Sequence, residues 1–271
     1  MKKISIILML LLLISNHILL LASATENDLQ ETQSTVLETE PQRVEDVVGI
    51  DAPAAILGTE KLVGNIRSAV VYESSSGSMM YAYNADMPMY PASFVKIMTA
   101  LIAIERGELS DEVIVSDSAM NSIPYDAVSM KLSVGEVITL ENLLYGLIVG
   151  SANDAAAVIA EHIAGTQQKF VELMNQNAQD IGCIGTTFTN VHGLHDDSQH
   201  TTARDSARIL DAALKNETFY KIFTTVSVDI PATNKSEMRH LSTGNSLMDK
   251  TSRLYFDGRA IGGRTGVTQD G

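Results

Sequence analysis

Cysteine and positive charge are both scarce in this sequence. Cys183 is the only cysteine among 271 residues, so no disulfide can form within the chain and its stability must come from a hydrophobic core. Acidic residues outnumber basic ones by 33 to 19, and the formal net charge is −14 at pH 7. Because the sequence also lacks a local basic patch, we expect no binding to nucleic acid or to an anionic membrane surface.

The single thiol also offers little chemistry of its own. Cys183 lies in the segment DIGCIGT, and no histidine that could activate it is near in the sequence. A free cysteine in such surroundings is usually a small buried residue, because a reactive thiolate needs a positive neighbour. We therefore predict that Cys183 is buried and is not a nucleophile.

The first 24 residues have the pattern of an export signal. Lys2 and Lys3 precede an almost wholly apolar stretch, residues 4–21, and Ala22, Ser23 and Ala24 provide the small residues of a cleavage site. An uncleaved signal anchor is the alternative, because the apolar run is long enough to span a bilayer. With either outcome the remainder of the chain is expected outside the cytoplasm, in the periplasm or on the cell-wall side of the membrane.

Beyond the signal, we predict two regions. Residues 25–53 are rich in acids and poor in apolar side chains, which is typical of a flexible linker. Residues 54–271 have globular composition and form the predicted folded domain, with no internal repeat and no low-complexity segment. No membrane anchor is expected after signal cleavage.

Hydrophobic periodicity places helices in the middle of this domain and strands at its two ends. Residues 67–73 and 78–83 are β-type runs separated by the turn signal SSSG, which predicts a hairpin. Apolar residues at spacings of three and four predict helices over 93–107, 139–150, 153–165, 166–182 and 202–216. Short β-type pieces follow from about Thr224. We therefore predict an α+β domain whose first and last strands share one antiparallel sheet.

Ser93 and Lys96 are the first candidate catalytic residues. They lie three residues apart at the start of a predicted helix, so their side chains share one face. A serine hydroxyl becomes a good nucleophile when a base takes its proton, and a lysine can be that base when its amine is neutral. Burial and a nearby second cation would both lower the lysine pKa. The alternative is a solvated serine cap and a surface lysine, although a lysine within an apolar helix needs a reason.

Two further elements carry suitable side chains. Ser151 and Asn153 lie in the tight loop VGSANDAAA, where they either cap the next helix or supply a hydroxyl for proton relay and an amide for a substrate peptide bond. Near the chain end, Arg264 is a fixed cation, Thr265 a hydroxyl donor, and Gly266 permits close backbone approach. A hairpin strand with a surface arginine is the alternative for this last element.

Together and in this order, these elements resemble the motifs S-x-x-K, S-x-N and K-T-G of penicillin-binding proteins. The chain resembles the low-molecular-mass penicillin-binding proteins of the serine D-alanyl-D-alanine carboxypeptidase family. The resemblance extends to segments 90–107, 143–165, 170–182, 188–210 and 262–268, in family order, and covers roughly residues 54–271. It implies a β-lactamase/transpeptidase-like fold, an antiparallel sheet with a helical lobe.

The resemblance also implies an activity. Ser93 would attack the carbonyl of the penultimate D-alanine of a peptidoglycan stem peptide, and Lys96 would take its proton. Ser151 would pass a proton to the leaving D-alanine, and water would then release the shortened peptide from Ser93. Penicillins would acylate the same serine as inhibitors, and no cofactor or metal would be needed.

For binding, the resemblance assigns Asn153 to the substrate backbone and Arg264 with Thr265 to the terminal carboxylate. The oxyanion hole would be formed by the N–H groups of Ser93 and Val267, and Gly266 would let the substrate approach the backbone closely.

Three features depart from the family pattern. Arg264 replaces the usual lysine; it keeps the charge but cannot become a neutral amine or occupy the same compact position. Val267 replaces an aromatic residue or histidine, which is expected to change substrate fit because only its backbone is needed for the oxyanion. The family continues beyond the position of Gly271 with further strands and a closing helix, so the resemblance implies a C-terminally incomplete domain.

Three alternative functions are open. A class A-like β-lactamase shares the motifs but needs a second carboxylate to activate water; Glu172 is the candidate, although its segment has the pattern of an amphipathic helix. A zinc peptidase is suggested by HGLHDDSQH, residues 192–200, which lacks a recognised zinc spacing. The third alternative is an inactive protein that binds cell-wall peptides or penicillins.

Overall fold

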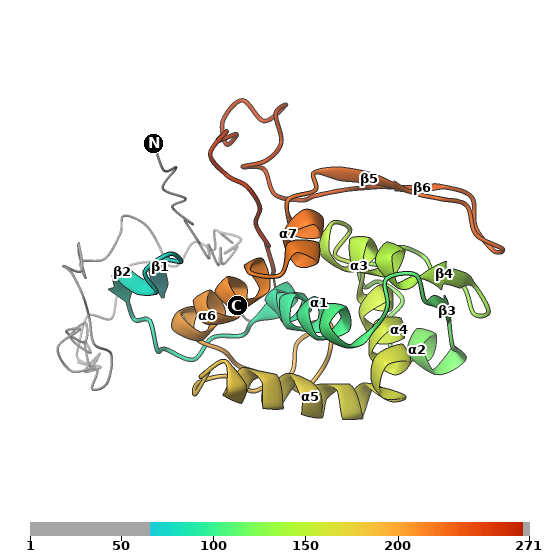
Figure 1. Cartoon of the computed structure of the whole chain (residues 1–271), viewed down its shortest axis with the longest axis horizontal. Coiled ribbons are helices and arrows are strands. Elements are labelled where there is room, and N and C mark those ends of the chain that lie inside the picture. Colours follow the sequence, from blue (N-terminus) through green and yellow to red (C-terminus); the bar gives the residue numbers. More distant parts are fainter. Residues whose placement is uncertain (1–65, 268–271) are drawn as a thin grey trace, which may run out of the picture.

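The computed structural model describes residues 66–267 of the chain (Figure 1). The predicted signal peptide, residues 1–24, and the predicted linker, residues 25–53, lie outside the described residues, as do 54–65 and 268–271. None of the helices between residues 66 and 267 is long and apolar enough to cross a membrane.

Helix α1, Val95–Arg106, is the centre of the fold (Figure 1). Its first nine residues, from Val95 to Ala103, are all buried, so the helix is enclosed on every side instead of having one solvent-facing stripe. It contacts five other helices: α3 (Leu140–Ile148), α4 (Asn153–Ala164), α5 (Gln167–Asp180), α6 (Ala203–Leu214) and α7 (Glu217–Phe223). The short helix α2, Asp117–Asn121, packs against α4.

The predicted helix limits are confirmed within a few residues, and local capping explains them. The side chain of Thr139 accepts the Asn142 N–H at the start of α3, and Thr202 caps α6 through the Asp205 N–H. Gly165 ends α4 in the left-handed conformation, with φ of 80°. Helices α2 and α7 were not predicted; each is short, five and seven residues, and carries too few turns for a periodic signal.

The strands form three antiparallel pairs within the described residues. Strand β1 (Ala69–Glu73) pairs with β2 (Ser78–Tyr83), which confirms the predicted hairpin. The other pairs are β3 (Glu112–Ile114) with β4 (Val137–Thr139), and β5 (Ser227–Ile230) with β6 (Arg239–Ser242).

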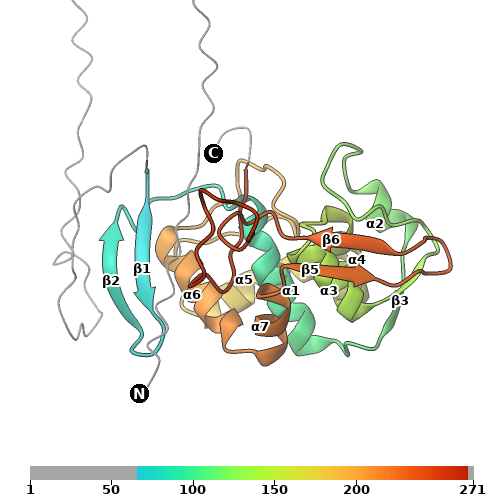
Figure 2. The ribbon, with the colours of Figure 1, turned by 90° about the horizontal axis from the view of Figure 1, so that it is seen from above.

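The prediction that the first and last strands share one sheet is wrong for the described residues. The β1–β2 hairpin contacts α6 at one end of the molecule, and the β5–β6 hairpin lies at the other end, with the loop after β6 between them (Figure 2). The backbone of residues 261–267, which follows this loop, forms no ladder with either hairpin. An extended segment becomes a strand only when its backbone pairs with a neighbour, and here the hairpins are too far apart along the molecule to share one.

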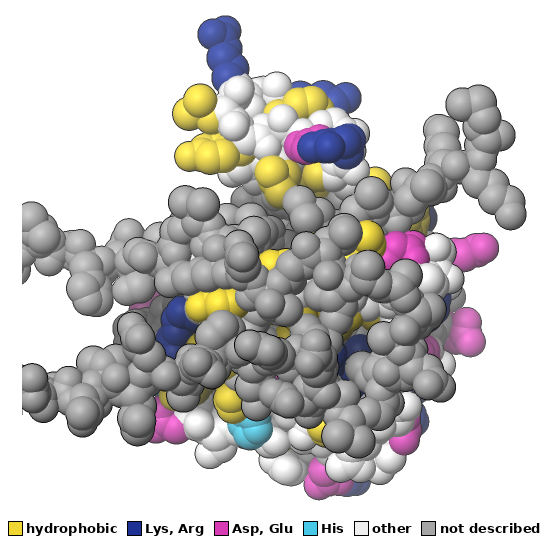
Figure 3. Space-filling view, turned by 90° about the vertical axis from the view of Figure 1, so that its left-hand side faces the viewer, with side chains coloured by type: hydrophobic (Ala, Val, Ile, Leu, Met, Phe, Trp, Pro, Cys, Tyr) yellow, Lys and Arg dark blue, Asp and Glu magenta, His cyan; other side chains and the backbone are white. Residues whose placement is uncertain are grey.

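The loop after β6 projects from the body of the protein (Figures 1 and 3). Leu254, Tyr255 and Phe256 in this loop are all exposed, and Figure 3 shows hydrophobic and basic side chains gathered on the projection. The chain then returns to the start of α1 at Arg264, so the loop links the β5–β6 hairpin to the centre of the fold.

A buried ion pair ties the β5–β6 hairpin to the helical part. Arg239 on β6 donates two hydrogen bonds, of 2.7 and 2.9 Å, to the carboxylate of Glu136, which is fully buried. Burial alone would raise the pKa of Glu136, but hydrogen bonds from Arg239 and Thr233 outweigh it and the net pKa is lowered. The carboxylate is therefore ionised at neutral pH and depends on its arginine.

We expect Arg239→Ala to lower the free energy of unfolding by about 3 kcal/mol at neutral pH, because it leaves an unpaired buried carboxylate. The loss should shrink as the pH falls, since protonation of Glu136 relieves the unpaired charge. Urea denaturation at neutral and acidic pH measures both effects. Lys221→Ala, which removes the exposed partner of Glu141, is the control and should change stability by less than about 1 kcal/mol. Equal losses for the two variants would contradict this account.

Candidate active site

Ser93 lies on a strained turn at the entrance of α1. The turn is a 3-10 segment, Ala92–Phe94, and Ala92 has φ of 48° although it is not glycine. A left-handed alanine costs about 1–2 kcal/mol, which the surrounding packing must offset. Ala92 is almost fully buried, at 2% exposure, so the turn is held from all sides. The strained backbone presents the hydroxyl of Ser93 to the side chains described next.

The amine of Lys96 is enclosed by three acceptors. Its Nζ lies 3.2 Å from Ser93 Oγ and 2.8 Å from Asn153 Oδ1, and it also donates to the carbonyl oxygen of His192. Lys96 is only 1% exposed, so the alternative of a surface lysine is wrong. Burial lowers its pKa well below the usual value, the charge of Arg264 lowers it further, and the charge of Asp154 opposes the shift.

This arrangement has a chemical consequence for the Ser93 hydroxyl. A neutral amine carries two hydrogens and one lone pair. When the oxygens of Asn153 and His192 accept the two hydrogens of Lys96, the lone pair faces the remaining neighbour, Ser93 Oγ. The geometry therefore allows Lys96 to accept the Ser93 proton once its own amine is neutral.

Ser151 brings a second hydroxyl to the same point. Its Oγ lies 3.4 Å from Ser93 Oγ and accepts a hydrogen bond from Arg264 Nη2. Ser151 has φ of 59°, another left-handed residue that is not glycine, and it lies in the loop between α3 and α4. Helix α4 begins after Ala152 without any side-chain cap, so the alternative that Ser151 caps this helix is wrong.

Asn153, the first residue of α4, is held in one orientation. Its Nδ2 donates to the carbonyl of Val128 at 2.9 Å, and its backbone N–H donates to the same carbonyl at 2.8 Å. The side-chain oxygen is consequently left to face Lys96. One hydrogen of Nδ2 is not used by the Val128 carbonyl, because an amide nitrogen carries two.

Arg264 closes the site from the C-terminal segment. Its Nε donates to the Ser93 carbonyl at 3.3 Å, and its Nη1 donates to the Ile148 carbonyl at 3.2 Å, in addition to the bond to Ser151. Burial lowers the pKa of Arg264 to about 10, so the guanidinium remains charged at neutral pH. The guanidinium of Arg264 therefore lies beside α1 and α3, and the alternative of a surface arginine on a hairpin strand is wrong.

The three residues after Arg264 run past the Ser93 turn. A Cβ on Gly266 would lie 2.9 Å from the backbone nitrogen of Ser93, so the two backbones are in close contact and glycine is required. Thr265 and Val267 are exposed, Val267 at 82%. Thr265 can therefore meet a ligand from solvent, and the structure brings all three residues to the same turn as Ser93.

The histidine side chains of residues 192–200 do not converge on a common metal-binding position. His192 is buried and its Nδ1 accepts the Leu194 N–H, whereas His195 pairs with Asp197 and His200 contacts the Ser198 carbonyl. Burial and the charge of Lys96 lower the pKa of His192 to about 4. Among residues 66–267, no group of three or more His, Cys, Asp or Glu side chains is arranged to hold a metal ion.

Two other predictions can be compared with the structure. Cys183 is buried, as predicted, and burial raises the pKa of its thiol to about 12. Glu172, the candidate second carboxylate, is an exposed residue of α5, as the helical pattern of its segment predicted.

Sequence reasoning missed Asp154 and Gly193. Asp154 is fully buried beside the site and accepts the backbone N–H groups of Met130 and Leu132. Gly193 packs directly against Ala92, and a Cβ there would lie 1.8 Å from the Ala92 carbonyl oxygen. A helix-start aspartate suggests only capping, but the position of Asp154 directly after Asn153 could have drawn attention to it.

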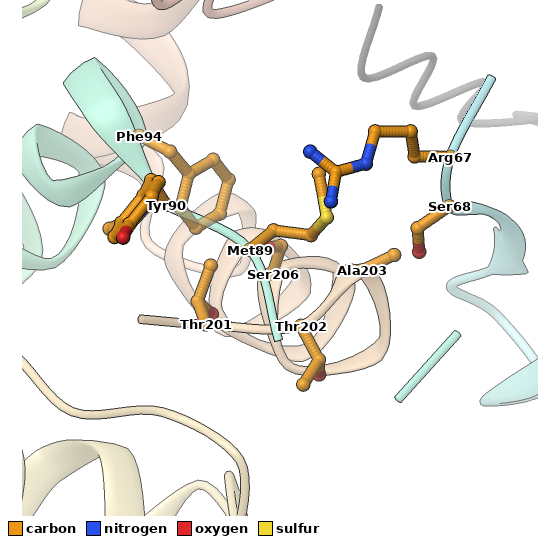
Figure 4. Close-up of a pocket in the computed structure, with 10 residues that line it drawn as sticks. Arg67, Ser68, Met89, Tyr90, Phe94, Thr201, Thr202, Ala203 and Ser206 are labelled. Atoms are coloured by element: carbon orange, nitrogen blue, oxygen red, sulfur yellow. The ribbon is translucent and has the colours of Figure 1, made fainter. Parts of the chain in front are cut away.

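A pocket lies at the same turn but is formed by other residues (Figure 4). Arg67, Met89, Tyr90, Phe94 and Thr202 are among the residues that line it, and none of the side chains around Lys96 does. The figure shows Arg67 reaching toward the pocket from the segment just before β1. It is therefore separate from the site of Ser93 and Lys96.

Substitution of Gly193 tests how the Ser93 turn is held. Gly193 and Gly182 both have φ of 85°, but nothing lies within 4 Å of a Cβ on Gly182. We expect Gly182→Ala to lower the unfolding free energy by about 1–2 kcal/mol through backbone strain alone. Gly193→Ala should cost about 2 kcal/mol more, because it must also displace Ala92. Chemical denaturation of both variants gives the difference, and an equal loss would refute the close packing as a constraint.

The sequence has recognisable relatives. The profile of a family described as D-alanyl-D-alanine carboxypeptidase, Peptidase_S11, matches residues 60–271. The D-alanyl-D-alanine carboxypeptidase DacA of Haemophilus influenzae is 33% identical over 199 residues, which cover 71% of this chain and 49% of the relative. The chain spans about half the length of the curated relatives it matches.

Solved structures have the same fold. The D-alanyl-D-alanine carboxypeptidase of Mycobacterium tuberculosis aligns with a TM-score of 0.67 and 27% identity, covering 79% of this chain and 78% of the other. Penicillin-binding protein 5 of Haemophilus influenzae aligns with a TM-score of 0.61 and 30% identity, covering 74% of this chain and 56% of the other. The predicted fold class is thereby confirmed. Since the family profile also covers most of the sequence, this chain belongs to the D-alanyl-D-alanine carboxypeptidase family of serine peptidases, Peptidase_S11.

Proposed function

We propose that the chain is a serine D-alanyl-D-alanine carboxypeptidase that removes the terminal D-alanine from peptidoglycan stem peptides. The observation that carries the proposal is the enclosed amine of Lys96, 3.2 Å from Ser93 Oγ, with its pKa held well below the ordinary range. A buried amine with two other acceptors is suited to one task, removal of the serine proton.

In the proposed reaction, Ser93 Oγ attacks the carbonyl carbon of the penultimate D-alanine while Lys96 takes the hydroxyl proton. The N–H groups of Ser93 and Val267 stabilise the oxyanion. The peptide C–N bond then breaks, and the leaving nitrogen receives a proton from Lys96 through Ser151, whose Oγ is 3.4 Å from Ser93 Oγ. Water finally attacks the ester carbonyl on Ser93 while the neutral amine of Lys96 takes one of its protons. The C–O bond to Ser93 Oγ then breaks, Lys96 returns the proton to Oγ, and the shortened peptide leaves with a new carboxyl group.

Substrate binding uses the donors that the protein leaves free. The second hydrogen on Asn153 Nδ2 is available for a carbonyl of the substrate backbone. Arg264 has five N–H groups and donates three bonds within the protein, so the remaining two can bind the terminal carboxylate together with the hydroxyl of Thr265. Gly266 lets the C-terminal segment lie close enough to Ser93 for its backbone to line the substrate site.

The same site would react with β-lactam antibiotics. The carboxylate and the strained amide of a penicillin match the groups that Arg264 and Ser93 would meet in the peptide, so acylation would occupy the nucleophile and hydrolysis would be slow. Because the proposed substrate is a wall component, the enzyme would act outside the cytoplasm. The signal at residues 1–24 would direct its export, and the linker at residues 25–53 would connect the signal to the catalytic domain at residues 54–271.

The nucleophile is tested with a fluorescent penicillin. The intact chain should be labelled and should release D-alanine from a stem pentapeptide, and Ser93→Ala should lose both activities by about three orders of magnitude or more. Ser76→Ala, at the exposed turn of the first hairpin, is the control and should be labelled like the parent. Labelling of Ser93→Ala at the parent rate would remove the proposal. Labelling followed by rapid hydrolysis of penicillin, without D-alanine release, would instead indicate a β-lactamase.

The charge of Arg264 should appear in the pH dependence of acylation. Lys96 acts when neutral, so the rate falls as the pH drops through the Lys96 pKa, and the nearby guanidinium keeps that pKa low. Arg264→Gln removes the charge, which raises the Lys96 pKa and moves the acidic limb of the profile to higher pH. Arg264→Lys keeps the charge and should move the limb less. Identical acidic limbs for parent and Arg264→Gln would contradict Lys96 as the base.

A further inference from the structure

The buried carboxylate of Asp154 has no task in the proposed reaction. It lies on the first turn of α4, fully buried, directly after Asn153. One oxygen accepts the N–H of Met130 at 3.0 Å and the other accepts the N–H of Leu132 at 3.0 Å. A carboxylate in the interior is costly unless it is well partnered, so its presence beside the buried amine of Lys96 calls for a function.

Through these bonds Asp154 holds the loop of residues 128–132. The loop contains Lys131 in the left-handed conformation, with φ of 60°, so it needs external support to keep its shape. At the start of the loop is Val128, whose carbonyl accepts both N–H donors of Asn153. The position of this carbonyl decides which end of the Asn153 amide faces Lys96.

The orientation of that amide matters for the base. With Nδ2 on the Val128 carbonyl, Oδ1 faces Lys96 and accepts one of its hydrogens at 2.8 Å. If the loop moved, the amide could rotate and present its NH2 group to Lys96, where two donors would meet and the lone pair of the amine would lose its direction toward Ser93.

Asp154 also contributes charge. The titratable or charged groups that face Lys96 are Arg264 from the C-terminal segment, His192 from the turn before Gly193, and Asp154 from α4. His192 is held neutral by its burial, so the balance around the amine is set by one cation and one anion. Of these groups, Asp154 is the one that favours the protonated amine.

We propose that Asp154 is a positioning residue for acyl transfer, which fixes loop 128–132 so that the Val128 carbonyl holds Asn153 with its oxygen toward Lys96, and which balances the charge of Arg264. This inference rests on the proposed function, since it assigns a supporting role in the same reaction. Asp154 touches neither substrate nor the reacting atoms.

The test compares Asp154→Asn with Asp205→Asn in the full chain. Asp205 is a matched control: it is a buried aspartate on the first turn of α6 that accepts the N–H of Gly185 and the hydroxyl of Thr186, away from Lys96. The rate constant of acylation by a fluorescent penicillin is measured from about pH 5 to about pH 10, with Tm as the measure of folding. The measurements are made well below the Tm of each variant, where nearly all molecules are folded, so partial unfolding does not distort the rate constant.

We expect Asp154→Asn to acylate about 10–100-fold more slowly than the parent at its optimum, because the base is misplaced. Its acidic limb should move to lower pH, since removal of the anion lowers the Lys96 pKa further. Asp205→Asn should lower Tm and leave the pH profile in place. Asp154→Ser, which is smaller and keeps one acceptor, takes the place of Asp154→Asn if that variant fails to fold.

Two results would overturn the inference: a parent-like rate and profile for the Asp154 variant, or the same shift in both aspartate variants, which would indicate a general effect of destabilisation. Failure of the proposed function looks different, because the parent chain itself would then remain unlabelled or would label equally in Ser93→Ala.

Discussion

The burial of one amine constrains the rest of this structure. Lys96 lies in the most enclosed helix of the fold, and a buried ammonium or amine without partners would cost several kcal/mol. The partners come from three separate segments: Ser93 from the turn before α1, Asn153 from the start of α4, and the His192 carbonyl from the turn before Gly193. These segments can meet at the amine only if α1 runs through the centre with α4 against it.

Two strained residues are consequences of that requirement. Ala92, directly before Ser93, and Ser151, whose Oγ lies 3.4 Å from Ser93 Oγ, both adopt left-handed conformations. Each costs about 1–2 kcal/mol relative to ordinary backbone, a cost that the buried α1–α4 packing must offset. Strain of this kind at a site is typical where a side chain must be presented at one fixed point. The glycines at 193 and 266 serve the same end, since each allows a second backbone to approach the Ser93 turn closely.

The sequence reveals much of this site because its chemistry is carried by local patterns. The three-residue spacing of Ser93 and Lys96 already places both on one helix face, and the caps at Thr139 and Gly165 mark helix limits. Strand pairing between distant segments is not local, so the predicted joint sheet was wrong. Likewise, no sequence pattern near Asp154 predicts its hydrogen bonds to the backbone of Met130 and Leu132, more than twenty residues earlier.

Arginine at position 264 keeps the positive charge that a lysine would have, but it changes the hydrogen bonds of the site. A lysine there would place one ammonium, a compact point charge that can turn toward whichever acceptor is best. The planar guanidinium instead donates simultaneously to the Ser93 carbonyl, the Ile148 carbonyl and the Ser151 hydroxyl. It thereby links the turn before α1, the end of α3 and the loop between α3 and α4. Because Ser151 Oγ accepts from Arg264, its own hydrogen must point elsewhere, and Ser93 Oγ is the acceptor within reach. Arg264 thus sets the direction of the second hydroxyl, as Asn153 sets that of the amine.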